Sequence, residues 1–158
     1  MRELILLRHA HAESPVAGQA DADRALSAEG LAASEAVGRW LVEHGRVPDC
    51  VLCSPARRTR ETLEAVLGVV GYVDQRLEPE IYEATPGALI ALADRHADVG
   101  RLMIVGHNPG LEQLAALLYS GQSGDYRGMP PAGIAVLHLP ADAAIEPGIA
   151  TLAAFWWP

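Results

Sequence analysis

Arginine and histidine side chains follow three short apolar runs (LILL, VLC and LMIV) in this 158-residue sequence. Arg8 and His9 come directly after the first run, an arginine-rich segment at residues 54–60 comes after the second, and His107 comes after the third. The planar guanidinium group binds phosphate through two parallel hydrogen bonds, and a neutral imidazole can attack phosphorus. These residue types therefore point to phosphoryl transfer to a histidine, with arginines balancing the charge of the phosphoryl oxygens.

The arginines of the second segment, Arg57, Arg58 and Arg60, fall at the start of a predicted helix. A helix N-terminus carries a partial positive charge, so cations are unfavourable there unless an anion lies between them. For a single arginine, the ordinary alternative is a surface position paired with Glu61 or Glu64 or exposed to solvent. The convergence of several cations after three apolar runs favours the anion site.

The apolar runs predict strands that must position these side chains. Parallel strands present their carboxyl ends at one edge of a sheet, where ligands bind in open α/β folds. Three further segments predict shorter strands, of which the last two could pair as a hairpin. The predicted strands, buried ones first, are residues 4–7, 49–53, 101–105, 72–77, 133–139 and 149–156.

Helical spacing of apolar residues, with a capping residue before each start, predicts four helices between the strands. They begin after Ser27, after Ser54 with Pro55 in the first position, after Thr85, and after Asn108. Strands alternating with helices predict an α/β fold. We expect a three-layer sandwich with a mostly parallel central sheet, at least one antiparallel strand, and helices on both faces.

Composition indicates that the whole chain, residues 1–158, forms a single globular domain, with 50% hydrophobic and 20% charged residues. A net charge of -8 argues against general binding to nucleic acids or anionic membranes. No apolar run has the length of a membrane span or a signal peptide, so the cytoplasm is the expected location. Cys50 and Cys53 fall in a predicted strand, so we expect buried thiols on opposite faces rather than a metal or redox pair.

Three segments, LLRHAHAE, SPARRTRET and VGHNPGL, resemble the signatures of the histidine phosphatase superfamily, the phosphoglycerate-mutase-like or RHG enzymes. The resemblance implies that His9 is the nucleophile that becomes phosphorylated and that Arg8 binds the phosphate. Arg58, and not Arg57, matches the second phosphate-binding arginine, and His107 matches the later histidine of the site. The short chain and the H-N-P-G-L form are most similar to the small SixA-type phosphohistidine phosphatases.

Two positions depart from the superfamily pattern. Ala10 stands where the family usually has glycine, so a small residue is kept. Larger members place a glutamate general acid three residues before an aromatic, but Pro79 holds that spacing before Tyr82, and Glu80 follows it. Glu80 is therefore the candidate general acid, and a surface carboxylate is the alternative. Imidazole is a better leaving group than an alkoxide, so a phosphohistidine substrate could make an acid dispensable.

His11 and Asn108 are further candidates for substrate contacts. His11 forms an H-x-H pair with His9, a pattern that can bind metal, but no downstream cluster of Asp, Glu or His with ligand spacing accompanies it. We expect His11 to line the mouth of the pocket and Asn108 to contact the substrate. No metal and no cofactor are predicted.

The function that fits these residues is a metal-independent phosphatase acting through phospho-His9. Connections too short to form a cap over the site favour phosphohistidine on a protein partner as substrate. Three alternatives stay open: a phosphatase of small phosphomonoesters, a metal hydrolase using His9 and His11, and a phosphate-binding module without turnover. An intact nucleophile argues against the binding module. Trp156 and Trp157 suggest a packing or oligomer interface.

Overall fold

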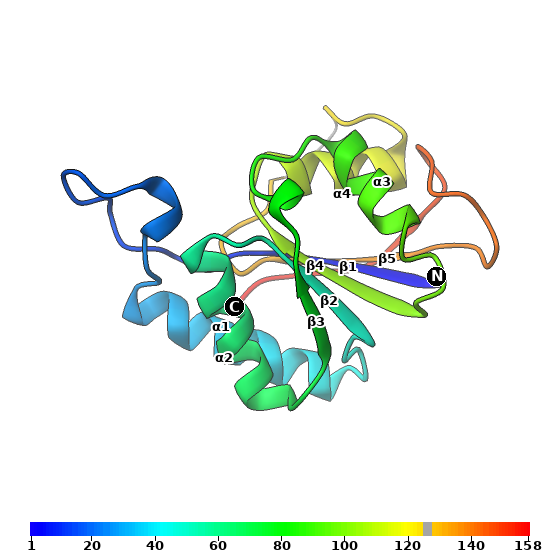
Figure 1. Ribbon diagram of the computed structural model, residues 1–158. Coiled ribbons are helices and arrows are strands. Elements are labelled where there is room, and N and C mark those ends of the chain that lie inside the picture. The colour runs from blue at the N-terminus through cyan, green and yellow to red at the C-terminus, as the bar shows by residue number, and fades with distance from the viewer. Residues whose placement is uncertain (125–127) are drawn as a thin grey trace.

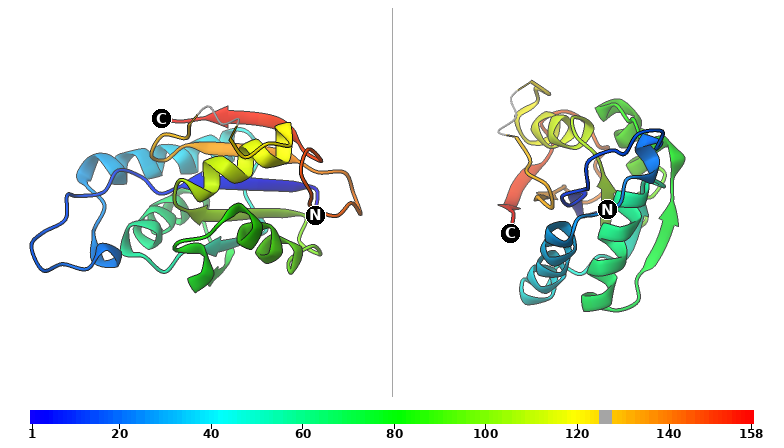
Figure 2. Two further views of the ribbon diagram at one scale, coloured as in Figure 1. Left: turned by 90° about the horizontal axis from the view of Figure 1, so that it is seen from above. Right: turned by 90° about the vertical axis from the view of Figure 1, so that its left-hand side faces the viewer.

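The computed structural model describes residues 1–124 and 128–158, and its strands form a six-stranded sheet. From one edge to the other, the strands run in the order β3, β2, β4, β1, β5, β6. The view from above the sheet shows them side by side, with β1 near the centre (Figure 2). Their bounds are β1 Glu3–Arg8, β2 Cys50–Cys53, β3 Asp74–Leu77, β4 Arg101–Gly106, β5 Ile134–His138 and β6 Thr151–Trp156.

The sheet is mostly parallel. β1 is parallel to β4, β4 to β2, and β2 to β3, whereas β5 is antiparallel to both β1 and β6. β5 and β6 are the last two strands of the chain, and their pairing is the one that the sequence predicted. The expected α/β fold with a mostly parallel sheet is confirmed.

Helices cover both faces of the sheet and complete the three layers (Figure 1). The side chains of β1 alternate between the two faces because successive strand residues point in opposite directions. Leu4 and Leu6 pack on the side of α3 and α4, whereas Ile5 and Leu7 pack on the side of α1 and α2, and all four are fully buried. The bounds are α1 Ala28–Glu43, α2 Arg57–Val70, α3 Pro86–Asp94 and α4 Gly110–Ser120, with short 3-10 helices η1 Asp21–Asp23 and η2 Pro79–Ile81.

Within the described ranges, no helix is long and apolar enough to cross a membrane. The two cysteines of β2 follow the same alternation as β1: Cys50 lies in the core beneath α3 and α4, and Cys53 lies in the core beneath α1 and α2. Both are buried free thiols, and burial raises the pKa of Cys53 to about 12. The prediction of structural cysteines on opposite faces is confirmed.

Two of the four predicted helix caps form as expected, and two differ. The hydroxyls of Ser27 and Thr85 accept hydrogen bonds from the first turns of α1 and α3. The predicted cap at Ser54 is wrong, because α2 begins at Arg57 and no side chain caps it. The fourth helix begins at Gly110, one residue later than predicted, although the Asn108 side chain still accepts from its first turn.

A close approach of α1 to the chain after β1 explains the glycine in its first turn. A Cβ atom built on Gly30 would lie 2.1 Å from the carbonyl oxygen of His11. The same oxygen accepts hydrogen bonds from the backbone N–H and the hydroxyl of Ser27. Any side chain at residue 30 would therefore push α1 away from the segment that follows the first strand.

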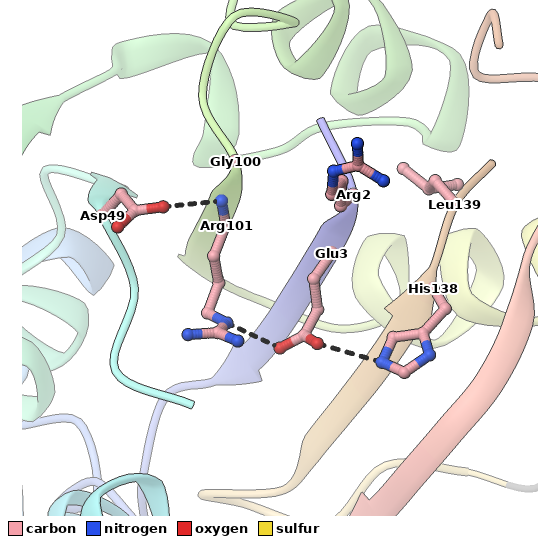
Figure 3. A pocket seen from close by; sticks show the side chains of 7 residues that line it. All are labelled: Arg2, Glu3, Asp49, Gly100, Arg101, His138 and Leu139. Carbon is pink, nitrogen blue, oxygen red and sulfur yellow. Dashed lines mark hydrogen bonds and ion pairs between the residues drawn. The ribbon is translucent and has the colours of Figure 1, made fainter. Parts of the chain in front are cut away.

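A charged cluster lies at the edge of the sheet where β1 and β4 begin (Figure 3). The Glu3 carboxylate is buried, and it accepts hydrogen bonds from Arg101 at 2.8 Å and from Arg46 at 2.8 Å. His138 Nε2 lies 2.9 Å from the same carboxylate. The adjoining concavity of about 460 Å³ is lined by Glu3 and two of its partners, Arg101 and His138, together with Arg2 and Asp49.

We expect the Glu3→Gln variant to lose about 2 kcal/mol of unfolding free energy, because it leaves cations without their charged partner. Arg46 and Arg101 are partly exposed, so water compensates for part of the loss. Urea unfolding measures the change, with Glu43→Gln as the control because Glu43 is exposed. Equal stability of the two variants would contradict the expectation, and so would a loss of activity in a folded Glu3→Gln protein.

Candidate active site

Strand register brings the predicted site residues together at the carboxyl ends of β1, β4 and β2. Arg8 pairs with Gly106 in the β1–β4 register, so His9 and His107 each follow one member of that pair. Their ring centroids are 5.3 Å apart. Cys53 pairs with Val105 in the β2–β4 register, and this places Ser54 beside His107. Three segments that are distant in sequence therefore meet at this edge.

The hydrogen bonding of His9 defines its tautomer. Its Nδ1 lies 2.7 Å from the carbonyl oxygen of Ala10. A carbonyl oxygen can only accept, so Nδ1 carries the hydrogen and donates it. The lone pair of the neutral ring is then on Nε2, which is the nitrogen available for attack.

Burial lowers the pKa of His9 to about 4, and the positive charges of Arg58 and Arg8 act in the same direction against the opposing hydrogen bond to Ala10. Burial likewise lowers the pKa of His107 to about 3, with His9 and Arg58 adding to the effect. The two arginines therefore help to keep the His9 ring unprotonated, but burial is the larger cause.

We expect the His9 imidazole to titrate with a midpoint near pH 4, far below the ordinary histidine value of about 6.5. The neutral form is then nearly complete above about pH 6 and is lost as pH falls through the midpoint. A two-dimensional NMR titration of the imidazole resonances, assigned with the His9→Gln variant, measures this directly. Circular dichroism at each pH shows whether the fold persists, and a midpoint near 6.5 in the folded protein would contradict the expectation.

Three buried nitrogens at this site have no hydrogen-bond partner among the described residues: Arg8 Nε, Arg58 Nε and His107 Nδ1. The other end of the Arg8 guanidinium donates to the carbonyl oxygen of Met129 at 2.7 Å. Buried polar groups without partners are rare and costly in proteins. Three of them beside the free nitrogen of His9 form a site that is suited to an anion with several oxygen atoms.

The S-x-x-x-R-x-x-x-T segment connects the strands of the site to each other. Ser54 Oγ lies 2.8 Å from Nε2 of His107. Thr62 Oγ1 donates to the backbone oxygen of Arg58 at 2.7 Å and accepts from the backbone N–H of Ala10 at 3.0 Å. The Thr62 hydroxyl therefore joins α2 to the turn that carries His9. The four-residue spacing of Arg58 and Thr62 puts both on one face of α2, whereas Ser54 precedes the helix.

The other predicted site residues, Glu80, His11 and Asn108, make contacts with groups of the protein itself. The Glu80 carboxylate pairs with Arg95 of the segment after α3. The exposed His11 has its Nδ1 2.7 Å from Ser27 Oγ. The Asn108 amide donates to the backbone of Met129 and to a glutamate of α4. The contacts of these three side chains hold neighbouring segments in place, and their roles toward a substrate stay predictions.

Two residues at the site went unassigned in the sequence. Asp21 lies on η1, and its carboxylate accepts from Arg58 at 2.9 Å. The Tyr82 ring packs edge-on against His107, with centroids 5.4 Å apart. The sequence identified Tyr82 only as the aromatic residue that follows the expected position of the general acid. The spacing of Asp21 from the arginine segment gave no indication that the two would meet. Among the described residues, no cluster of three or more His, Cys, Asp or Glu side chains could hold a metal ion.

Comparison with known proteins agrees with this geometry. The histidine phosphatase superfamily (branch 1) matches residues 4–99. An uncharacterised protein of Mycobacterium tuberculosis is 37% identical over 161 residues, which cover 96% of this chain and 99% of that protein. A SixA of Agrobacterium tumefaciens, described as a proposed phosphohistidine phosphatase, has a TM-score of 0.85 at 29% identity and covers 99% of this chain and 98% of its own. The corresponding protein of Nakamurella multipartitia has a TM-score of 0.84 at 32% identity, covering 99% and 96%.

The mostly parallel sheet, with two histidines and two arginines at one edge, agrees with a phosphatase, and the chain belongs to the histidine phosphatase superfamily. Within that superfamily it is SixA-like, because the SixA structures match it over nearly their whole length. The sequence motifs indicated both the superfamily and the likeness to SixA-type proteins, and both are confirmed. The substrate does not follow from membership of the family.

Proposed function

We propose that the protein removes the phosphoryl group from a phosphohistidine on a protein partner, through a covalent phosphohistidine on His9. The observation that carries the proposal is a set of three buried nitrogens, on Arg8, Arg58 and His107, that lie near Nε2 of His9 and have no partner in the part of the chain that the structure describes. The likeness to SixA structures, each described as a proposed phosphohistidine phosphatase, supports the substrate class.

Two steps follow from this arrangement. Nε2 of His9 attacks phosphorus in line, the bond between phosphorus and the substrate imidazole breaks, and that imidazole leaves with the electron pair. Water then attacks phospho-His9, which releases inorganic phosphate and restores the neutral ring. Arg8 and Arg58 balance the negative charge on the phosphoryl oxygens in both steps. If the Ser54 hydroxyl donates to Nε2 of His107, the ring hydrogen is on Nδ1, from which it can donate to a phosphoryl oxygen.

The contacts of the two carboxylates Asp21 and Glu80 favour a substrate whose leaving group needs no proton donor. Asp21 accepts hydrogen bonds from Tyr82 and Arg58, and these contacts lower the pKa of its carboxyl group, so it stays ionised. Glu80 is paired with Arg95. A phosphoimidazole that is protonated on its far nitrogen leaves as neutral imidazole, whereas an alkoxide must receive a proton as it leaves. This difference favours phosphohistidine over an alkyl phosphoester.

A metal ion is not required by this mechanism. The positive charge that a metal would supply to the phosphoryl oxygens comes from the guanidinium groups of Arg8 and Arg58. We therefore propose that turnover is independent of divalent cations. The cytoplasmic location of the protein stays a prediction.

The test is turnover on a histidine-phosphorylated protein, prepared with phosphoramidate, beside phosphoserine and other alkyl phosphomonoesters. We expect kcat/KM to be at least about tenfold higher for phosphohistidine, since general acid catalysis is worth about 10²-fold or more to an ester. EDTA should leave the rate unchanged. A higher kcat/KM for a small phosphomonoester would support the alternative of a small-molecule phosphatase, and loss of activity in EDTA would overturn metal independence.

The same panel tests Glu80 with the Glu80→Gln variant. We expect its rate on phosphohistidine to stay within about twofold of the wild-type rate, because no proton donor is needed there. Glu83→Gln, which changes a nearby glutamate of the same charge, is the control. A selective loss on phosphoserine would identify Glu80 as the acid for esters, and an equal loss on both substrates would contradict the proposed leaving-group chemistry.

A further inference from the structure

The segment between β1 and α1 extends beyond the carboxyl-end edge of the sheet and returns to it through η1 (Figure 2). Asp21, the first residue of η1, meets Arg58 there with two groups. Its backbone oxygen accepts from Nη1 of Arg58 at 2.8 Å, and its Oδ2 accepts from Nη2 at 2.9 Å. The Arg58 side chain is 8% exposed, whereas the Asp21 side chain is 52% exposed. The exposed residue Asp21 therefore binds the two terminal nitrogens of the buried Arg58 side chain.

The contact with Asp21 leaves a different edge of the guanidinium group open. A guanidinium can offer its two terminal nitrogens together, or Nε together with one terminal nitrogen, to a planar pair of oxygens. Asp21 occupies the first of these edges. Arg58 Nε is buried and has no partner in the described part of the chain. The edge that includes Nε is thus the one available to a phosphoryl group.

A second element fixes Asp21 in turn. The Tyr82 hydroxyl donates to Oδ2 of Asp21, and Arg24 donates to Oδ1 at 3.1 Å. The Arg58 guanidinium carbon lies 5.9 Å from the centroid of the Tyr82 ring, which also contacts His107 edge-on. Asp21 therefore links η1 to Tyr82, which directly follows η2, and to Arg58 of α2.

We propose that Asp21 is a positioning residue, which holds the guanidinium group of Arg58 so that its Nε edge faces the phosphoryl group, with Tyr82 fixing the Asp21 carboxylate. This inference rests on the proposed role of Arg58 as a phosphate ligand. Asp21 itself does not touch the phosphate in this arrangement.

The direction in which the affinity for phosphate changes distinguishes this positioning role from electrostatic repulsion by the Asp21 carboxylate. A carboxylate near a phosphate repels it, so removing the charge of Asp21 would strengthen phosphate binding if repulsion were its main effect. If Asp21 positions Arg58, removing the charge releases the guanidinium and weakens phosphate binding. The Asp21→Asn variant keeps the size of the side chain and changes its charge, so it gives opposite results under the two explanations.

The probe is inorganic phosphate, with its dissociation constant measured by calorimetric titration, and turnover of phosphohistidine protein is measured in parallel. We expect Asp21→Asn to raise the dissociation constant and KM about tenfold, as for loss of one charge-assisted hydrogen bond to arginine, with a smaller change in kcat. Tyr82→Phe should shift both constants in the same direction by a smaller factor. Asp23→Asn, the same charge change at an exposed residue of η1, should leave both unchanged.

Unchanged or tighter phosphate binding by Asp21→Asn would overturn the positioning role, and so would an equal effect of Asp23→Asn. Should Asp21→Asn fail to fold, Tyr82→Phe decides the question: weaker phosphate binding supports the positioning role, and unchanged or tighter binding overturns it. Failure of the proposed function is recognised separately, because the wild-type protein would then bind inorganic phosphate without hydrolysing phosphohistidine, or would bind no phosphate.

Discussion

Replacing His9 with asparagine is expected to abolish turnover, with a loss of at least about 10³-fold in kcat, because the covalent route has no other nucleophile. Asparagine keeps the small polar character of the side chain but offers no basic nitrogen in place of Nε2. The variant should still bind inorganic phosphate, since Arg8, Arg58 and His107 remain. Loss of chemistry with binding retained is therefore the expected signature.

Labelling of the protein during turnover gives the direct measurement. Wild-type protein that is quenched in base should carry a phosphoryl group that is stable in base and labile in acid, as expected of a phosphorylated imidazole. His9→Asn should carry none. His44→Asn is the control, because His44 stacks on Trp40 at the end of α1 and lies outside the site. Full activity of His9→Asn, or a label that persists in it, would show that another residue accepts the phosphoryl group.

The Arg58→Lys variant is expected to lose about 10²-fold in kcat/KM, because lysine keeps the charge but cannot present two parallel donors. The Arg58 side chain is almost fully buried, and its Nε has no partner among residues 1–124 and 128–158, so the ammonium group cannot reproduce the contact. Lysine would also lose one of the two hydrogen bonds to Asp21. Both losses act on the same phosphate-binding edge.

Arg57 provides a matched control at the next position of the same helix. Its side chain is 48% exposed and pairs with Glu61 at 3.5 Å. Arg57→Lys should keep kcat/KM within about twofold, as for most exposed ion pairs. Comparison of the two variants by steady-state kinetics on phosphohistidine protein tests which arginine belongs to the site. Equal losses in both would contradict the assignment of Arg58 by its spacing from Ser54 and Thr62.

Much of the fold could be predicted because local patterns agree with the tertiary structure. The run Leu4–Leu7 is fully buried as predicted, and Ser27 and Thr85 cap their helices because their side chains meet N–H groups only three residues ahead. Such signals depend on neighbouring residues, so a sequence displays them directly. The meeting of His9 with His107 followed from the further rule that parallel strands end at one edge.

The predictions that were wrong or missing concern residues whose structure depends on contacts with residues distant in the sequence. Ser54 has the sequence of a helix cap, but His107 lies within hydrogen-bond distance of its hydroxyl, and α2 begins three residues later. Asp21 and Tyr82 are 61 residues apart and meet only after η1 and η2 have packed. Glu80 is exposed and paired with Arg95, a contact that its spacing from Tyr82 did not indicate. Contacts of this kind leave no periodicity to detect.

The pairing of β1 with β4 also determines when the site can exist during folding. Glu3 and Arg101 are opposite each other in this register, although 98 residues separate them in the chain. Closing so long a loop is slow, and parallel pairing cannot begin before both strands are available. A nascent chain that has not yet exposed β4 therefore carries His9 without His107 beside it. We expect phosphatase activity to appear only with the complete sheet, at the end of folding.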